Sequence, residues 1–233
     1  MKYRHLLLLT SVTLAINLSF ASLNNIKEGR DYTILEDPIE SIHPDKVELV
    51  EVFSYVCTHC KDFDPILKKY ESHLDDPDVA FRNIHVFWAP EFLNLIRLSV
   101  AVDENQMTQV ANNYIFQATF NDKVNFFDEK TTIEWLNKQT NFDGKKIAQS
   151  YQTPHNKNKA KDISILSKKY KLETTPNIVI GGKYKVSLNA LKSETDLVRI
   201  LDGLINLSKK DKLPINVLIN TGGEFVHLAN QSK

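Results

Sequence analysis

Both cysteines of this chain lie in a single Cys-X-X-Cys motif, Cys57-Thr58-His59-Cys60. The motif directly follows an apolar run over residues 47–56 and opens a segment whose apolar residues recur with the period of an α-helix. A strand that passes into a helix at two cysteines favours an α/β fold. Because the two sulfurs are too close in the chain to close a large stabilising loop, the motif predicts a pair that cycles between dithiol and disulfide.

The N-terminus has the pattern of a secretory signal peptide. Lys2 and Arg4 precede an apolar run over residues 6–20, and small residues precede a cleavage point after Ala21. Polar residues interrupt the run, and it is short for a membrane span, so we interpret it as a cleaved signal rather than an uncleaved anchor. No cysteine stands directly after it to carry a lipid. We therefore expect removal of residues 1–21 on export to an oxidising compartment, the periplasm of a Gram-negative bacterium.

Charge gives no indication of a nucleic-acid partner. The chain has 29 Lys and Arg residues against 29 Asp and Glu residues, and removing Lys2 and Arg4 with the signal leaves a slight acidic excess. Short lysine runs are typical of solvated helix faces. The mature chain of about 212 residues is long enough for one large domain or for a domain that carries an insertion.

Segments with strand character bracket a long helical middle. The strand candidates are residues 31–35, 47–56, 79–88, 177–180 and 183–188. The helix candidates are residues 60–74, 92–102 and 107–118, a helix opened by a capping box over 131–134, then 143–151, 160–170 and a last helix capped by Ser193. The order strand, helix, strand over 47–88 predicts a βαβ unit with parallel strands. Gly181-Gly182 predicts a hairpin turn, and Pro65 predicts a kink in the first helix.

Residues 47–70 and 172–188 together resemble the thioredoxin fold. The helical block over residues 90–171 makes the chain similar to the DsbA family of periplasmic thiol:disulfide interchange proteins. The motifs that carry the resemblance are Glu51, Phe53-Ser54-Tyr55, the cysteine pair with His59, Thr175-Pro176 and Gly182-Lys183-Tyr184. The fold class that follows is α/β, a thioredoxin-like fold with an inserted all-helical subdomain.

The resemblance divides the chain into five parts. Residues 1–21 are the signal peptide, residues 22–89 are the first part of the thioredoxin-like domain, and residues 90–171 are the inserted helical subdomain. The second part of the thioredoxin-like domain covers residues 172–210. The tail over residues 211–233 is mixed in character and has no assignment.

The expected reactive site is centred on the cysteine pair. Cys57 would lie at the N-terminus of a helix, where unpaired amide N–H groups and the positive end of the helix dipole favour a thiolate. His59 adds to that preference when it is charged or donates a hydrogen bond, although it also fits an ordinary surface histidine. Cys60, one turn further along the helix, is expected to be more buried and to act as the resolving thiol.

Four further residues are assigned by the resemblance. Glu51 would be a buried acid that helps proton transfer near the cysteines, with a salt-bridged edge residue as the alternative. Pro176 would follow a cis peptide bond. Thr58 stands where the family usually has Pro, and Thr175 stands where it usually has Val, a choice more like the DsbC and DsbG isomerases. We expect the hydroxyl of Thr175 to hydrogen-bond Cys57, and the apolar residues Trp88 and Phe92 to lie in the core.

The resemblance implies a monomeric thiol oxidase that passes its disulfide to reduced or partly folded secreted proteins. It implies no cofactor, and a DsbB-like membrane quinone reductase as the partner that restores the disulfide. An isomerase or reductase of the same fold, suggested by Thr175, stays open, as does a non-catalytic periplasmic chaperone or binding protein. We expect no metal site, because a tetrahedral zinc site needs two further ligands beyond Cys57 and Cys60 and the sequence offers no clear second pair.

Overall fold

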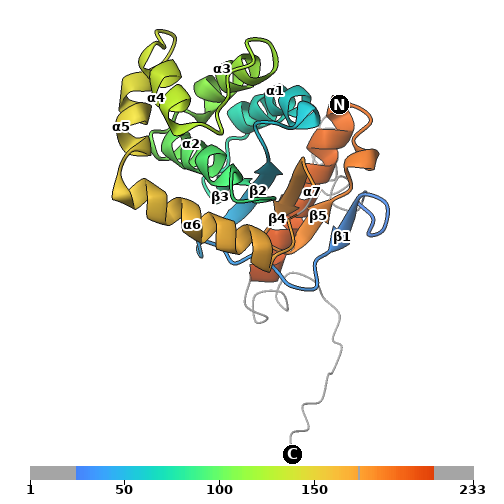
Figure 1. Ribbon diagram of the computed structural model, residues 1–233. Helices are drawn as coiled ribbons and strands as arrows, with labels where there is room; N and C mark the ends of the chain where they lie inside the picture. The colour runs from blue at the N-terminus through green and yellow to red at the C-terminus, as the bar shows by residue number, and fades with distance from the viewer. Residues whose placement is uncertain (1–24, 173, 213–233) are drawn as a thin grey trace, which may run out of the picture.

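The computed structural model describes residues 25–172 and 174–212 (Figure 1). The predicted signal peptide and residues 213–233 of the unassigned tail lie outside this range. The strands are β1 Tyr32–Ile34, β2 Val47–Phe53, β3 Val79–His85, β4 Asn177–Ile180 and β5 Tyr184–Val186. The helices are α1 Thr58–His73, α2 Phe92–Glu104, α3 Thr108–Phe120, α4 Glu129–Asn137, α5 Gly144–Tyr151, α6 Pro154–Lys169, the short 3₁₀ helix η1 Leu188–Ala190 and α7 Glu194–Lys212.

Within the described residues the strands form a five-stranded sheet in the order β1-β5-β4-β2-β3. β2 pairs parallel with β3 and antiparallel with β4, which confirms the predicted βαβ unit. β2 therefore lies inside the sheet, and all seven of its residues are buried. They are buried because helices cover both faces: α1 and α7 share one apolar cluster with the strands, and α6 shares another.

The helices α2 to α6 lie between β3 and β4 in the chain, and α2 to α5 gather on one side of the sheet (Figure 1). Their apolar side chains form a cluster that also takes in Phe53, Tyr55 and Cys60. The helical block therefore packs directly against the end of β2 from which the cysteine pair emerges. No strand lies in the described part of residues 90–171, as predicted. No described helix combines the length and the apolar character that crossing a membrane requires.

Two helices begin earlier than predicted because other residues cap them. α4 begins at Glu129, before the predicted box, since the side chain of Asp128 caps it by accepting a hydrogen bond from the amide of Thr131 at 2.7 Å. α6 begins at Pro154, because the hydroxyl of Thr153 caps it and proline suits the first helical position.

Four strands end one to three residues earlier than predicted, among them β1 at Ile34 and β2 at Phe53. β3 ends at His85, and the side chain of Trp88 is 44 % exposed, so its placement in the core was wrong. β5 ends at Val186, and Leu188 begins η1. Pro65 lies inside α1, which continues to His73. The predicted hairpin turn is confirmed, with the amide of Lys183 donating to the carbonyl of Ile180 at 3.2 Å.

Candidate active site

The cysteine pair lies where β2 passes into α1. The chain turns after Phe53, and Cys57 is the N-cap residue of α1. The amide of Cys60 donates a hydrogen bond to the sulfur of Cys57 at 3.2 Å. Because the first amides of a helix have no partner within it, this sulfur occupies a position where negative charge is stabilised.

The two thiols differ in burial in the predicted order. Both are free; Cys57 is partly buried and Cys60 is fully buried. Burial raises the pKa of the Cys60 thiol far above its ordinary value, and its hydrogen bond with Cys57 raises it further. The backbone of Ser54 and the hydroxyl of Thr175 oppose that rise. Cys60 therefore keeps its proton, which leaves Cys57, the more exposed sulfur at the start of α1, as the thiol placed to react.

The peptide bond between Thr175 and Pro176 is cis, as predicted. It places the carbonyl of Thr175 3.6 Å from the sulfur of Cys57, which donates to it. The side chain of Thr175 also acts on Cys60, whose pKa it lowers, and its expected hydrogen bond to a Cys57 thiolate stays a prediction. The cis-proline segment therefore faces both sulfurs, with its carbonyl toward one and its side chain toward the other.

Glu51 is a buried carboxyl group in the middle of the sheet. It is 2 % exposed, and it pairs with Asn83 of β3 and Ile178 of β4, so the edge-strand alternative was wrong. Burial raises its pKa to about 8, against the lowering effect of the Lys68 ammonium. Its Oε2 atom has no hydrogen-bond partner among the described residues. Glu51 is therefore a neutral acid at pH 7, placed to release a proton when the pH or its surroundings change slightly.

A hydrogen-bonded chain joins the helical block to this region. The hydroxyl of Tyr55 donates to the side-chain oxygen of Asn112 at 2.8 Å, and the amide group of Asn112 donates to Asp64 of α1 at 2.9 Å. All three side chains are buried, and burial raises the pKa of the Asp64 carboxyl. The sequence offered no signal for Asn112, because an asparagine on an exposed helix face looks the same.

His85, at the end of β3, is another residue that the sequence did not reveal. It is fully buried, and its Nε2 atom accepts a hydrogen bond from the amide of Tyr55 at 3.1 Å. Ser54 Oγ lies 3.4 Å from the same nitrogen. The available signal was a histidine at the end of an otherwise apolar strand.

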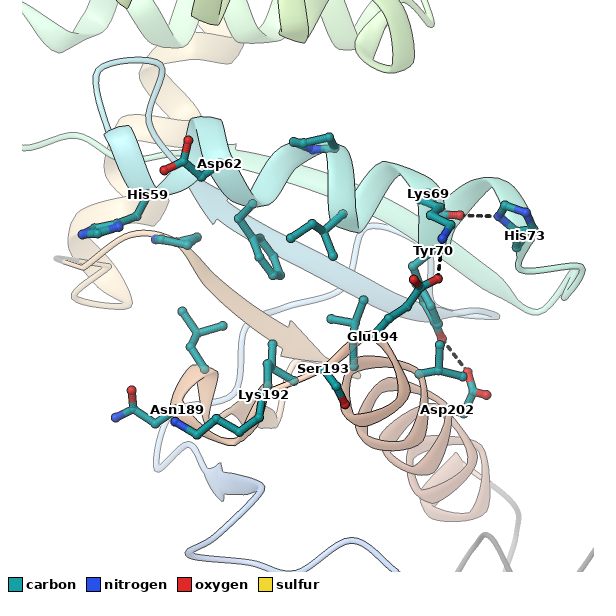
Figure 2. Close-up of a pocket in the computed structure, with 18 of the residues that line it drawn as sticks. His59, Asp62, Lys69, Tyr70, His73, Asn189, Lys192, Ser193, Glu194 and Asp202 are labelled. Carbon is teal, nitrogen blue, oxygen red and sulfur yellow. Dashed lines mark hydrogen bonds and ion pairs between the residues drawn. The ribbon is translucent and has the colours of Figure 1, made fainter.

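Thr58 and His59, between the cysteines, are exposed. A groove of about 1190 Å³ begins at His59 and the cis-proline segment and runs between α1 and the start of α7 (Figure 2). An ion pair between Lys69 and Glu194 joins the two helices at 2.6 Å. The apolar lining residues are Phe63, Pro65, Ile66, Leu74, Pro176, Leu188, Leu191, Leu197 and Val198. The groove thus offers an apolar surface next to the reactive sulfur.

Solved structures of similar sequence have the same architecture. The oxidoreductase NmDsbA1 of N. meningitidis is 34 % identical, with a TM-score of 0.74 over 80 % of this chain and 95 % of that one. The chain belongs to the DsbA family. Its meningococcal relative NmDsbA3 is 32 % identical, with a TM-score of 0.72 over 80 % of this chain and 99 % of that one.

A curated DsbA sequence supports the same assignment. The thiol:disulfide interchange protein DsbA of Burkholderia cepacia is 27 % identical over 207 residues, which cover 88 % of this chain and 97 % of the relative. No family model matches the chain. The predicted thioredoxin-like fold and the predicted family are confirmed, and the chain is a thiol:disulfide oxidoreductase. Within the described residues, no group of three or more His, Cys, Asp or Glu side chains is arranged to hold a metal ion.

Proposed function

We propose that this protein is a periplasmic thiol oxidase that passes the Cys57–Cys60 disulfide to reduced or partly folded secreted proteins. The observation that carries the proposal is the asymmetry of the pair. Cys57 caps α1 and accepts the amide of Cys60 at 3.2 Å, whereas Cys60 is fully buried. A dithiol form in which the Cys57 thiolate is stabilised in this way makes the disulfide form a good oxidant.

The disulfide exchange takes place in two steps. A substrate thiolate attacks the sulfur of Cys57, the Cys57–Cys60 bond breaks, and Cys60 leaves as a thiolate that takes up a proton. A second substrate thiolate then attacks the substrate sulfur of the mixed disulfide and releases the Cys57 thiolate. The substrate loses two electrons to form its disulfide, and the protein gains them as a dithiol. Attack by Cys60 on the mixed disulfide is the reverse path, which frees a trapped substrate.

Glu51 would supply and recover the proton of Cys60. A thiol that keeps its proton in the dithiol form must gain that proton when it leaves and lose it on reoxidation. Glu51, with a pKa raised to about 8, can both hold and release a proton near neutral pH. It lies in β2, the strand that leads into the cysteine turn.

The groove and the cis-proline segment would receive the substrate. An extended polypeptide could pair with the backbone of Thr175 as an added strand, and its apolar side chains would enter the groove between α1 and α7. Thr58 and His59 are exposed beside Cys57, so they would contact the bound segment. These positions would set how the disulfide is presented to the substrate.

The cellular setting is part of the same proposal. The signal-like residues 1–21 would direct export, and the thioredoxin-like parts 22–89 and 172–210 would carry the inserted helical subdomain 90–171. A monomer would be reoxidised by a DsbB-like membrane quinone reductase. An isomerase or reductase is the second candidate, since the hydroxyl of Thr175 acts on Cys60 and such a contact changes the redox equilibrium.

The redox equilibrium of the pair against a glutathione buffer separates these candidates. An oxidase should favour the dithiol form, and its disulfide form should unfold at lower denaturant than its dithiol form. A disulfide form that unfolds at clearly higher denaturant would favour the reductase instead. Cys60→Ser with Cys57 reduced should accumulate a mixed disulfide when it is mixed with a disulfide-bonded peptide: the Cys57 thiolate attacks the peptide disulfide, half of the peptide leaves as a thiol, and no Cys60 remains to resolve the product. The matched variant Cys57→Ser should not, because its remaining thiol is buried. A protein that traps no substrate in either variant would contradict disulfide exchange altogether.

A further inference from the structure

His85 lies behind the turn that carries the cysteines, and no step of the exchange described above uses it. Its side chain is fully buried. The ring packs among three aromatic rings, with centroids 5.2 Å from Phe53, 5.6 Å from Tyr55 and 6.3 Å from Phe92. A phenyl ring would fill such a space at lower cost, so a histidine here calls for a polar role.

Its partners determine which nitrogen carries the proton. The amide of Tyr55 points at Nε2 at 3.1 Å, so Nε2 must accept. Nδ1 lies 2.9 Å from the carbonyl of Val86, which can only accept, so Nδ1 must donate. Burial lowers the pKa of His85 to about 4, so the ring is neutral at pH 7. Both nitrogens are thus satisfied only in the neutral form protonated at Nδ1.

The backbone that His85 holds contacts both cysteines. Ser54, next to Tyr55, accepts a hydrogen bond from the amide of Cys57 at 3.0 Å through its carbonyl. The backbone of Ser54 also interacts with the thiol of Cys60 and lowers its pKa. The turn from Ser54 to Cys57 is thus tied to the Cys57 amide and the Cys60 thiol on one side and to the imidazole on the other.

We propose that His85 is a positioning residue for disulfide exchange: its neutral imidazole holds the amide of Tyr55 and thereby keeps Ser54 aimed at Cys57 and Cys60. The inference rests on the proposed redox role of the pair. A disulfide joins the two cysteines covalently, whereas the dithiol form relies on these hydrogen bonds to hold the turn. Losing the acceptor at Nε2 therefore destabilises the dithiol form more than the disulfide form. The disulfide is then less readily reduced, so the protein becomes a weaker oxidant.

Two substitutions of His85 test the roles of its two ring nitrogens separately. The side-chain amide of His85→Gln reaches the position of Nε2, and that of His85→Asn reaches only the position of Nδ1. We expect His85→Asn to shift the glutathione equilibrium about fivefold or more toward the disulfide form, because a buried amide then lacks its acceptor. His85→Gln should stay within about twofold of the unmodified protein, because it keeps an acceptor there. Unchanged equilibria in both variants, or equal shifts in both, would overturn the proposal.

A measurement on the unmodified dithiol protein tests the hydrogen bonds even if a variant fails to fold. Nitrogen chemical shifts of the His85 ring at pH 7 should show the neutral form protonated at Nδ1. A ring protonated at Nε2, or doubly protonated, would overturn the proposal. Failure of the proposed function is distinguishable, because the unmodified protein would then not oxidise a dithiol peptide whatever the state of His85.

Discussion

Replacing Glu51 with glutamine tests the charge state that burial imposes on this carboxyl group. The folded protein raises its pKa from 4.5 to about 8, so above pH 4.5 the folded protein keeps a proton that the unfolded chain releases. Stability must therefore fall as the pH rises from about 4.5 to about 8. Glutamine keeps the shape of the side chain and does not titrate, so Glu51→Gln escapes this loss.

Proton linkage gives the size of the effect. A shift of this size costs the unmodified protein about 1 kcal/mol at pH 5, about 3 kcal/mol at pH 7 and about 4 kcal/mol at pH 8. Relative to the unmodified protein, Glu51→Gln should therefore gain about 2 kcal/mol of unfolding free energy between pH 5 and pH 7, and about 3 kcal/mol by pH 8. The two proteins also differ in unfolding free energy because the glutamine amide packs differently from the carboxyl group. That contribution does not depend on pH, so it cancels when the difference at one pH is subtracted from the difference at another.

Urea unfolding of both dithiol proteins in the presence of a reductant, at pH 5, 7 and 8, measures the difference directly. Glu40→Gln is the matched control, because Glu40 is exposed and its pKa is lowered by the hydrogen bond from Lys169. Relative to the unmodified protein, Glu40→Gln should not gain stability as the pH rises, since folding lowers the pKa of Glu40 rather than raising it. Parallel pH profiles for Glu51→Gln and the unmodified protein would refute the assignment of a neutral, buried Glu51.

Three other substitutions or treatments give clear outcomes. Thr175→Val removes the hydroxyl that acts on Cys60 and should change the glutathione equilibrium or the lifetime of the mixed disulfide; equal values in both proteins would leave Thr175 a packing residue. Alkylation of the dithiol form at mildly acidic pH should modify Cys57 before Cys60, and equal labelling would contradict the assigned order. Gly182→Ala should destabilise the protein by about 2 kcal/mol or more in urea unfolding, because φ is +71° and the added carbon meets a neighbouring carbonyl; Gly29→Ala, at φ +77° in open space, should cost only about 1 kcal/mol.

The sequence by itself determined the local frame of the site. The change from a buried strand to an amphipathic helix at Cys57 is a property of neighbouring residues, and it places that cysteine at a helix N-terminus. The hairpin at Gly181-Gly182 is also determined by neighbouring residues, since both glycines have a positive φ that other residues avoid. Asp128 and Thr131 can both cap a helix. The local pattern selected Thr131, so it placed the cap of α4 three residues after the observed cap, Asp128.

The tertiary structure alone decided the chemistry around the sulfurs. The pKa of Glu51 depends on β2 lying inside the sheet with helices on both faces, and no pattern within the strand reports how much water is excluded. Thr175 divides its carbonyl and hydroxyl between Cys57 and Cys60 only after the cis-proline segment, more than a hundred residues away, packs against α1. His85 likewise gains its partners because parallel pairing brings β3 beside β2. Burial and long-range hydrogen bonds arise only when distant segments meet. The motif therefore identified the reactive cysteines, but only the fold determined the protonation of the groups around them.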